Sequence, residues 1–190
     1  MKKVLFSLLL AGLVSTTQVA VAQSGSGPAV SYTENVLAEE IGKEILFRRA
    51  LDWTENHFSY GPKTGAKSDL AAGTVRVTGT GKVTPVTTNG KELVQTIRFD
   101  FVFRATDKGY DYSVGSFRVI PDPNQPENTV MLSDYIGQLA TEKGNGKTFN
   151  DRRVTAQANA LASEAAMSFR SYMNTMPAAE ENTLGQPAAN

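Results

Sequence analysis

A strict alternation of side chains over residues 93–105 constrains the fold more than any other feature of the sequence. One set of alternate positions is apolar except at Gln95: Leu93, Ile97, Phe99, Phe101 and Phe103. The intervening set is mainly polar: Val94, Thr96, Arg98, Asp100, Val102 and Arg104. A period of two places the two sets on opposite faces of a β-strand. The pattern therefore predicts an antiparallel strand with one buried face and one solvated face.

The segment that follows predicts the partner of this strand. Residues 106–109, with the sequence TDKG, are typical of a hairpin loop. One register satisfies both faces, and it pairs Ala105 with Tyr110, Phe103 with Tyr112, Phe101 with Val114 and Arg104 with Asp111. A slip by one residue would exchange the two faces of one strand and break both patterns. After Gly115 the apolar pattern shifts to Phe117 and Val119, as a β-bulge would cause.

The remaining elements are predicted from their own periodicities. Strands are expected at residues 30–36 and 73–86, and helices at residues 39–58, 129–143 and 150–175. Gly79 and Gly81 suggest a bulge or bend, and the proline-rich residues 121–126 suggest a stiff, extended linker. This order of elements, a strand, a helix, antiparallel strands and then helices, is typical of α+β proteins. We therefore expect an α+β two-layer sandwich, with helices on one face of an antiparallel sheet and extra C-terminal helices.

The N-terminal residues predict a cleavable secretory signal peptide. Lys2 and Lys3 precede an apolar run at residues 4–14, and residues 20–22 form an A-x-A cleavage site. The apolar run is shorter than the roughly 20 residues of a membrane-spanning helix, although a retained N-terminal anchor is the alternative. Cleavage after Ala22 would place the mature chain in the periplasm or the medium, with no transmembrane segment.

The mature chain is expected to hold one domain. Residues 1–22 are the predicted signal peptide, and residues 23–28 are a predicted flexible leader rich in Gly and Ser. Residues 29–176 are long enough for a single α+β domain. Residues 177–190 carry one large apolar residue, Leu184, and we expect a disordered tail there.

A family pattern runs through the first half of this domain. Residues 42–50 are followed by Trp53 and Phe58, by the glycine-marked strand 73–81, and by the two aromatic strands. This order resembles the exported bacterial family called domain of unknown function 4468, which is described with a TBP-like fold. The resemblance implies a curved, helix-backed sheet as a TBP-like core at 29–120, and the predicted helical extension at 128–176 lies outside the part that resembles the family. It implies an envelope or secreted location, and it brings no known activity and no catalytic residues.

The sequence also excludes several kinds of chemistry. Cysteine is absent, which removes disulfides, thiol nucleophiles and thiolate metal sites. His57 is the single histidine, and we expect a surface or boundary residue rather than a catalytic base. Residues 144–148, GNGKT, do not complete a phosphate loop, because Thr141 stands where its first glycine is required. We therefore predict no catalytic residue, no metal and no cofactor.

The polar face of the sheet is the best candidate for a binding surface. Its predicted members are Arg76, Arg98, Arg104, Thr74, Thr78 and Thr96. Guanidinium forks suit carboxylate or phosphate groups on glycans, lipids or peptides. A face that serves only solubility is the alternative. Lys plus Arg and Asp plus Glu both number 19, so no net charge favours nucleic acid as a partner.

These features together favour a non-enzymatic binding or structural module that works in the envelope or outside the cell. Its partner would be an envelope protein, a glycan or a small ligand. Two alternatives stay open: a carboxylate-dependent hydrolase of envelope substrates and a carrier of hydrophobic ligands. Catalytic carboxylates are brought together only by the fold, and aromatic strands can line a cavity as well as fill a core.

Overall fold

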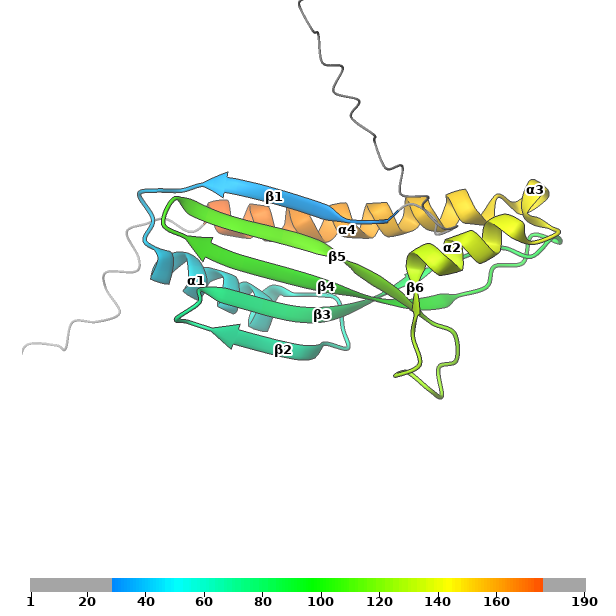
Figure 1. Cartoon of the computed structure of the whole chain (residues 1–190), viewed down its shortest axis with the longest axis horizontal. Helices are drawn as coiled ribbons and strands as arrows, with labels where there is room; N and C mark the ends of the chain where they lie inside the picture. Colours follow the sequence, from blue (N-terminus) through cyan, green and yellow to red (C-terminus); the bar gives the residue numbers. More distant parts are fainter. Residues whose placement is uncertain (1–28, 176–190) are drawn as a thin grey trace, which may run out of the picture.

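A computed structural model of the chain describes residues 29–175 (Figure 1). The predicted signal peptide, leader and tail lie outside these residues. The strands are β1 (Tyr32–Leu37), β2 (Thr64–Asp69), β3 (Thr74–Val83), β4 (Gln95–Thr106), β5 (Gly109–Ile120) and β6 (Val130–Met131). The helices are α1 (Lys43–Asp52), the π-helical η1 (Trp53–His57), α2 (Leu132–Thr141), α3 (Asn145–Thr148) and α4 (Asn150–Thr175). None of them is long and apolar enough to cross a membrane.

The six strands form one antiparallel sheet, which confirms the α+β class. Their spatial order is β1-β5-β4-β3-β2, and β6 pairs with β5 at residues 118–119, beyond the part that β1 covers. The predicted hairpin register is confirmed, because Ala105 pairs with Tyr110 and Arg104 pairs with Asp111. The predicted bulge is also present, since the register shifts after Gly115.

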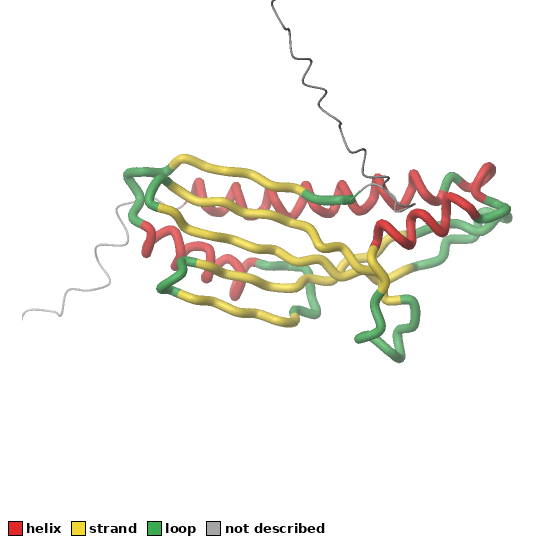
Figure 2. The backbone as a smooth tube through the Cα atoms, in the orientation of Figure 1, coloured by secondary structure: helices red, strands yellow, loops and turns green. Residues whose placement is uncertain are grey.

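The apolar face of the sheet is covered by helices. Phe101 lies at the centre of this inner face, with ring centroids 4.8 Å from Trp53 of η1 and 4.9 Å from Phe169 of α4. Because Phe101 contacts both η1 and α4, α1–η1 and α4 lie on the same side of the sheet. In Figures 1 and 2 these helices lie behind the strands, and the opposite face, which we call the outer face, is open.

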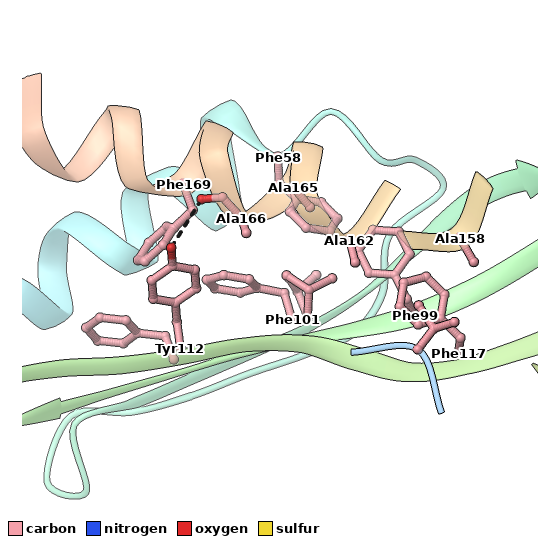
Figure 3. Close-up of a cluster of buried hydrophobic side chains, with 14 of the residues drawn as sticks. Phe58, Phe99, Phe101, Tyr112, Phe117, Ala158, Ala162, Ala165, Ala166 and Phe169 are labelled. Atoms are coloured by element: carbon pink, nitrogen blue, oxygen red, sulfur yellow. Dashed lines mark hydrogen bonds between the residues drawn. The ribbon is translucent and has the colours of Figure 1, made fainter. Parts of the chain in front are cut away.

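Small side chains allow α4 to approach the aromatic inner face closely. Four buried alanines share one side of this helix: Ala158, Ala162, Ala165 and Ala166. Figure 3 shows them above the rings of the inner face, where the Tyr112 hydroxyl donates a hydrogen bond of 3.5 Å to the carbonyl of Ala166. Close packing of these rings fills the space between sheet and helix.

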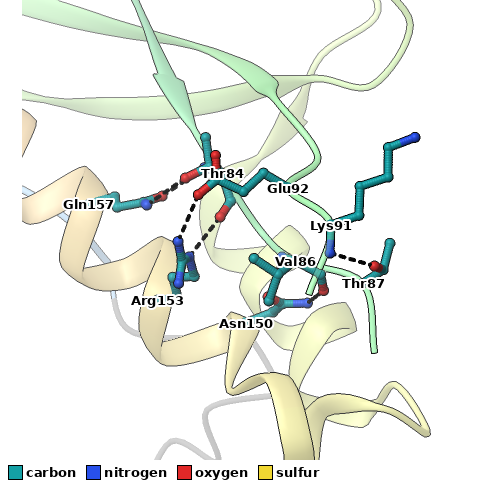
Figure 4. Close-up of polar contacts among 8 residues, drawn as sticks. All are labelled: Thr84, Val86, Thr87, Lys91, Glu92, Asn150, Arg153 and Gln157. Carbon is teal, nitrogen blue, oxygen red and sulfur yellow. Dashed lines mark hydrogen bonds and ion pairs between the residues drawn. The ribbon is translucent and has the colours of Figure 1, made fainter. Parts of the chain in front are cut away.

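The loop between β3 and β4 is fixed to α4 by side chains from successive turns of the helix (Figure 4). Asn150 accepts a hydrogen bond from the amide of Val86 at 2.8 Å and donates to its carbonyl at 2.9 Å. Gln157 accepts from the amide of Thr84 at 2.7 Å, and Arg153 donates to the Thr84 carbonyl at 2.8 Å. Paired backbone groups hold this loop in place, although it belongs to neither strand.

This docked loop explains why the predicted start of the central strand is wrong. β4 begins at Gln95, so Leu93 and Val94 lie in the loop, where they are 48% and 64% exposed. Leu93 donates its backbone N–H to the carbonyl of Pro85 at 2.8 Å. Hydrogen bonds within the loop therefore set the conformation at Leu93, and the alternation of the strand does not extend into the loop.

The other predicted boundaries are corrected as follows. The first helix starts at Lys43, because residues 38–41 form a turn closed by the Ile41 amide on the Ala38 carbonyl. Residues 121–126 are not extended, since the Gln125 amide donates to the Asp122 carbonyl in a turn. β2 was not predicted, and the reason is that all six of its residues are exposed and carry no apolar alternation.

Gly79 and Gly81 do not form the predicted bulge. Both lie in β3 within an unbroken register against β4. A Cβ at Gly79 would lie 2.7 Å from Phe58 and 2.8 Å from Phe99, and a Cβ at Gly81 would collide with Leu161. These glycines therefore make room for side chains that pack on the inner face.

Candidate functional site

All six predicted site residues lie on the outer face. Thr74, Arg76 and Thr78 belong to β3, and Thr96, Arg98 and Arg104 belong to β4. The register pairs Thr74 with Arg104 at one end, and it pairs Thr96 with Lys82 near the other. The six residues therefore share a face, but they are spread along the strands and do not meet at one point.

Each of the three arginines is held by a carboxylate. At one end, Arg104 donates from Nη2 at 2.8 Å and from Nε at 3.2 Å to Oδ2 of Asp111, while Asn35 donates to the other oxygen. The hydrogen bonds from Arg104 and Asn35 lower the pKa of Asp111. At the other end, Nη2 of Arg98 lies 3.5 Å from Oε1 of Glu127. The arginines are thus oriented by the protein before any ligand arrives.

Asp100 forms a buried ionic centre in the middle of the outer face. Its side chain is only 3% exposed, and it accepts hydrogen bonds from Arg76 at 2.6 Å, Thr78 at 2.7 Å and Arg118 at 2.8 Å. Burial raises the pKa of Asp100, but the hydrogen bonds from Thr78 and Arg76 and the charge of Arg118 outweigh it, and the net pKa is lowered. Arg76 and Thr78 therefore serve this structural cluster first.

A shallow hollow of about 300 Å³ lies beside this cluster. It crosses the four strands β1, β5, β4 and β3, and its side chains include Thr33, Ser113, Val102, Asp111, Arg104 and Thr74. The register explains it, because Thr33, Ser113 and Val102 form one row of short side chains across the sheet. The long Arg104 lies in the neighbouring row, between Asp111 and Thr74. The outer face is therefore hollowed where short side chains are next to a long one.

Only two of the predicted site residues, Thr74 and Arg104, line this hollow. The other four lie outside it: Arg76 and Thr78 at the Asp100 cluster, Arg98 near Glu127, and Thr96 opposite Lys82. The sequence did carry one unused signal: Val102 is apolar on an otherwise polar face, and the predicted hairpin register places Ser113 opposite it. Thr33 could not be found in this way, because the pairing of β1 with β5 joins segments far apart in the chain.

His57 belongs to a second polar cluster on the helical side of the molecule. Its Nε2 lies 3.6 Å from Oδ2 of Asp52, and its ring centroid lies 4.6 Å from that of Tyr172, whose hydroxyl donates to the same carboxylate. Burial, with the hydrogen bond and charge of Asp52, raises the pKa of Tyr172 to about 12. Ser168 and Ser171 line the adjacent surface pocket, but the structure gives no serine–histidine hydrogen bond among the described residues. His57 is thus a boundary residue that joins η1 to α4.

A family model for a domain of unknown function with a TBP-like fold, DUF4468, matches residues 32–119. Residues 32–119 therefore form a DUF4468 domain. The matched segment runs from the start of β1 to Val119, the penultimate residue of β5. The DUF4468 domain therefore contains the outer face and the hollow, and α2, α3 and α4 follow it.

Two solved structures are similar to this chain. One is a TBP-like protein from Parabacteroides distasonis, with 16% identity over 75% of this chain and 93% of that chain, and a TM-score of 0.46. The other is a DUF4468 family protein from Bacteroides ovatus, with 11% identity over 77% of this chain and 91% of that chain, and a TM-score of 0.48. None of the curated proteins matches.

Proposed function

We propose that this DUF4468 chain is an exported, non-enzymatic binding module that holds a small polar ligand in the hollow of the outer face. The observation that carries the proposal is the hollow itself, about 300 Å³ in volume, on a face that the helices leave open. Its lining includes the apolar Val102 and the hydroxyl-bearing Thr33, Ser113 and Thr74. Mixed apolar and hydroxyl-bearing surfaces suit ligands such as sugars, which carry both kinds of group.

Arg104 supports a ligand that also carries a negative charge. It uses Nε and one Nη for Asp111, which leaves further N–H donors of the guanidinium for a ligand. Because Asp111 fixes the guanidinium, little side-chain entropy would be lost on binding. A sugar unit with a carboxylate, as part of an envelope glycan, fits this arrangement best.

The inner face favours a binding module over a carrier of hydrophobic ligands. Phe169 of α4 contacts five inner-face or η1 rings at centroid distances from 4.8 to 6.0 Å. Rings in such contact fill the space that a carrier would need for its cargo. The aromatic side chains of the strands therefore favour a packed core over a ligand cavity.

Binding to an array of neutral and uronic-acid oligosaccharides tests the proposal, with two matched variants. Val102→Lys places a long cation in the hollow, whereas Val94→Lys makes the same change at an exposed loop position outside it. We expect wild type and Val94→Lys to bind the same acidic oligosaccharide and Val102→Lys to bind at least tenfold more weakly. Equal binding by Val102→Lys would refute the site, and an array without any bound sugar would refute the ligand class.

The same samples test the absence of catalysis. We expect the bound oligosaccharide to be recovered intact by mass spectrometry after prolonged incubation. Cleavage that disappears on replacement of a single carboxylate would overturn the non-enzymatic function and favour the hydrolase.

A further inference from the structure

We propose that the free edge of β1 binds an extended peptide segment of a partner protein, which adds a strand to the sheet. The segment would place an apolar side chain in the pocket at the end of β1 and a Lys or Arg beside Glu39 and Glu40. This surface lies at the rim of the sheet and borders the ligand hollow at Thr33.

The two edges of the sheet differ in how they are protected. Among residues 29–175, β1 is paired only with β5, and β2 is paired only with β3. β2 carries a register irregularity between Thr64 and Lys67, a left-handed Gly65 and the charge of Lys67. Such bulges and lysines are devices that prevent a further strand from pairing.

β1 has none of these devices. Its six residues, Tyr32–Leu37, pair with β5 in an unbroken register. Its single charged side chain, Glu34, points inward, where Arg170 of α4 forms an ion pair with it and the hydroxyls of Tyr32 and Tyr112 donate to it. Leu37, at the end of the strand, is 74% exposed. Because Arg170 neutralises this one charge and the edge has no bulge and no lysine, the edge can serve as a template for strand addition.

The hydrogen-bonding groups of the free edge can be assigned. The amide of Ala38 donates to the carbonyl of Lys108, in register with the β1–β5 ladder. Since amides alternate in direction along a strand, the even-numbered residues of β1 face β5. The N–H groups of Thr33, Asn35 and Leu37 therefore point to the free edge and are available to an added strand.

α4 provides a floor under the position of an added strand. The Glu34–Arg170 ion pair places this flank of the helix along β1. Met167 lies three residues before Arg170 on the same side of the helix and is 61% exposed. Inward side chains of an added strand would meet Met167 near one end of β1 and Asn174 near the other.

A pocket of about 470 Å³ lies at that second end. Its apolar lining is Val36, Leu37, Ala38, Ile41, Leu46, Tyr110 and Met173. Glu39 and Glu40 also line it, and no Lys or Arg of the described part of the chain does. The pocket thus suits one large apolar side chain, and the adjacent acidic pair suits a cationic neighbour by charge complementarity.

Panning of the purified protein against a displayed library of random heptapeptides tests the inference. We expect enrichment of peptides with apolar residues at alternate positions and a Lys or Arg beside one of them. Asn35→Pro removes one free-edge N–H without removing a backbone hydrogen bond between β1 and β5, and we expect it to weaken binding of the enriched peptides at least tenfold. Asn35→Ala is the matched control, because it loses the contact with Asp111 but keeps the N–H. We expect it to bind as wild type does.

A second variant keeps the test decisive if Asn35→Pro does not fold. Glu39→Lys with Glu40→Lys should shift enrichment from cationic to acidic peptides and leave the alternation unchanged. Enrichment without alternation, or equal binding by folded Asn35→Pro and wild type, would overturn the inference. A dimer in sedimentation that Asn35→Pro dissociates would also overturn it, since the edge would then serve a second copy of this chain. Sugar binding by the Glu39→Lys, Glu40→Lys variant should stay intact, because neither residue lines the hollow, and this result separates the two surfaces.

Discussion

Replacement of Phe169 by alanine tests the packing of α4 on the sheet. The ring is fully buried and contacts Trp53, Phe101, Phe103, Tyr110 and Tyr112. Removal of a buried ring loses roughly 2 kcal/mol of transfer free energy. The cavity of about 100 Å³ costs about 24 cal/mol per Å³ more, because five rings fixed in the sheet and helices cannot collapse into it. We therefore expect a loss of about 4–5 kcal/mol in the free energy of unfolding.

Urea unfolding followed by tryptophan fluorescence measures this loss. With an m value of about 2 kcal/mol/M for a domain of this size, the midpoint should fall by about 2 M. Met167→Ala is the control on the same helix, since its side chain is exposed, and it should change the stability by less than about 0.5 kcal/mol. A loss below about 1.5 kcal/mol for Phe169→Ala would refute the packing of α4 on the inner face.

Three further results are expected. Phe101→Ala should destabilise the domain by about 3–5 kcal/mol and Val102→Thr by far less, because they lie on opposite faces of β4; equal losses in urea would mean that the faces are misassigned. Asp100→Asn should destabilise the protein at pH 7. Because the pKa of Asp100 is lowered in the folded protein, its ionised carboxylate stabilises the fold at pH values above the ordinary carboxyl pKa near 4. This stabilisation is lost as the pH falls through the lowered pKa, so wild type and variant should converge in acid melts. Intact mass of the exported protein should correspond to a chain that starts at Gln23; retention of residues 1–22 would contradict the predicted cleavage.

The parts of the fold that depend on neighbouring residues could be predicted from the sequence. The β4–β5 hairpin was predicted with its register and bulge because both faces had to agree over a short loop. The last helix was predicted at residues 150–175, where it is observed. By contrast, β2 escaped prediction because its residues are all exposed, so no apolar period marks it.

The candidate site was only partly predictable, for a related reason. The arginines and threonines were placed correctly on the outer face, since a strand face follows from period two alone. Which of them are free depends on contacts across strands, and Asp100, Asp111 and Glu127 hold the three arginines. The hollow depends on the row that β1 adds to β5, and such long-range pairing leaves no mark on a single segment.

Amide chemical shifts of the isotope-labelled protein, followed during titration with the oligosaccharide that binds best, test the ligand site most directly. We expect the largest shifts at Thr33, Val102 and Ser113, with smaller ones at Arg104 and Asp111. Residues of the β3–β4 loop and of the pocket beside His57 should not move. Largest shifts at either of those places, with Val102 and its neighbours unchanged, would contradict a binding site on the outer face of the sheet.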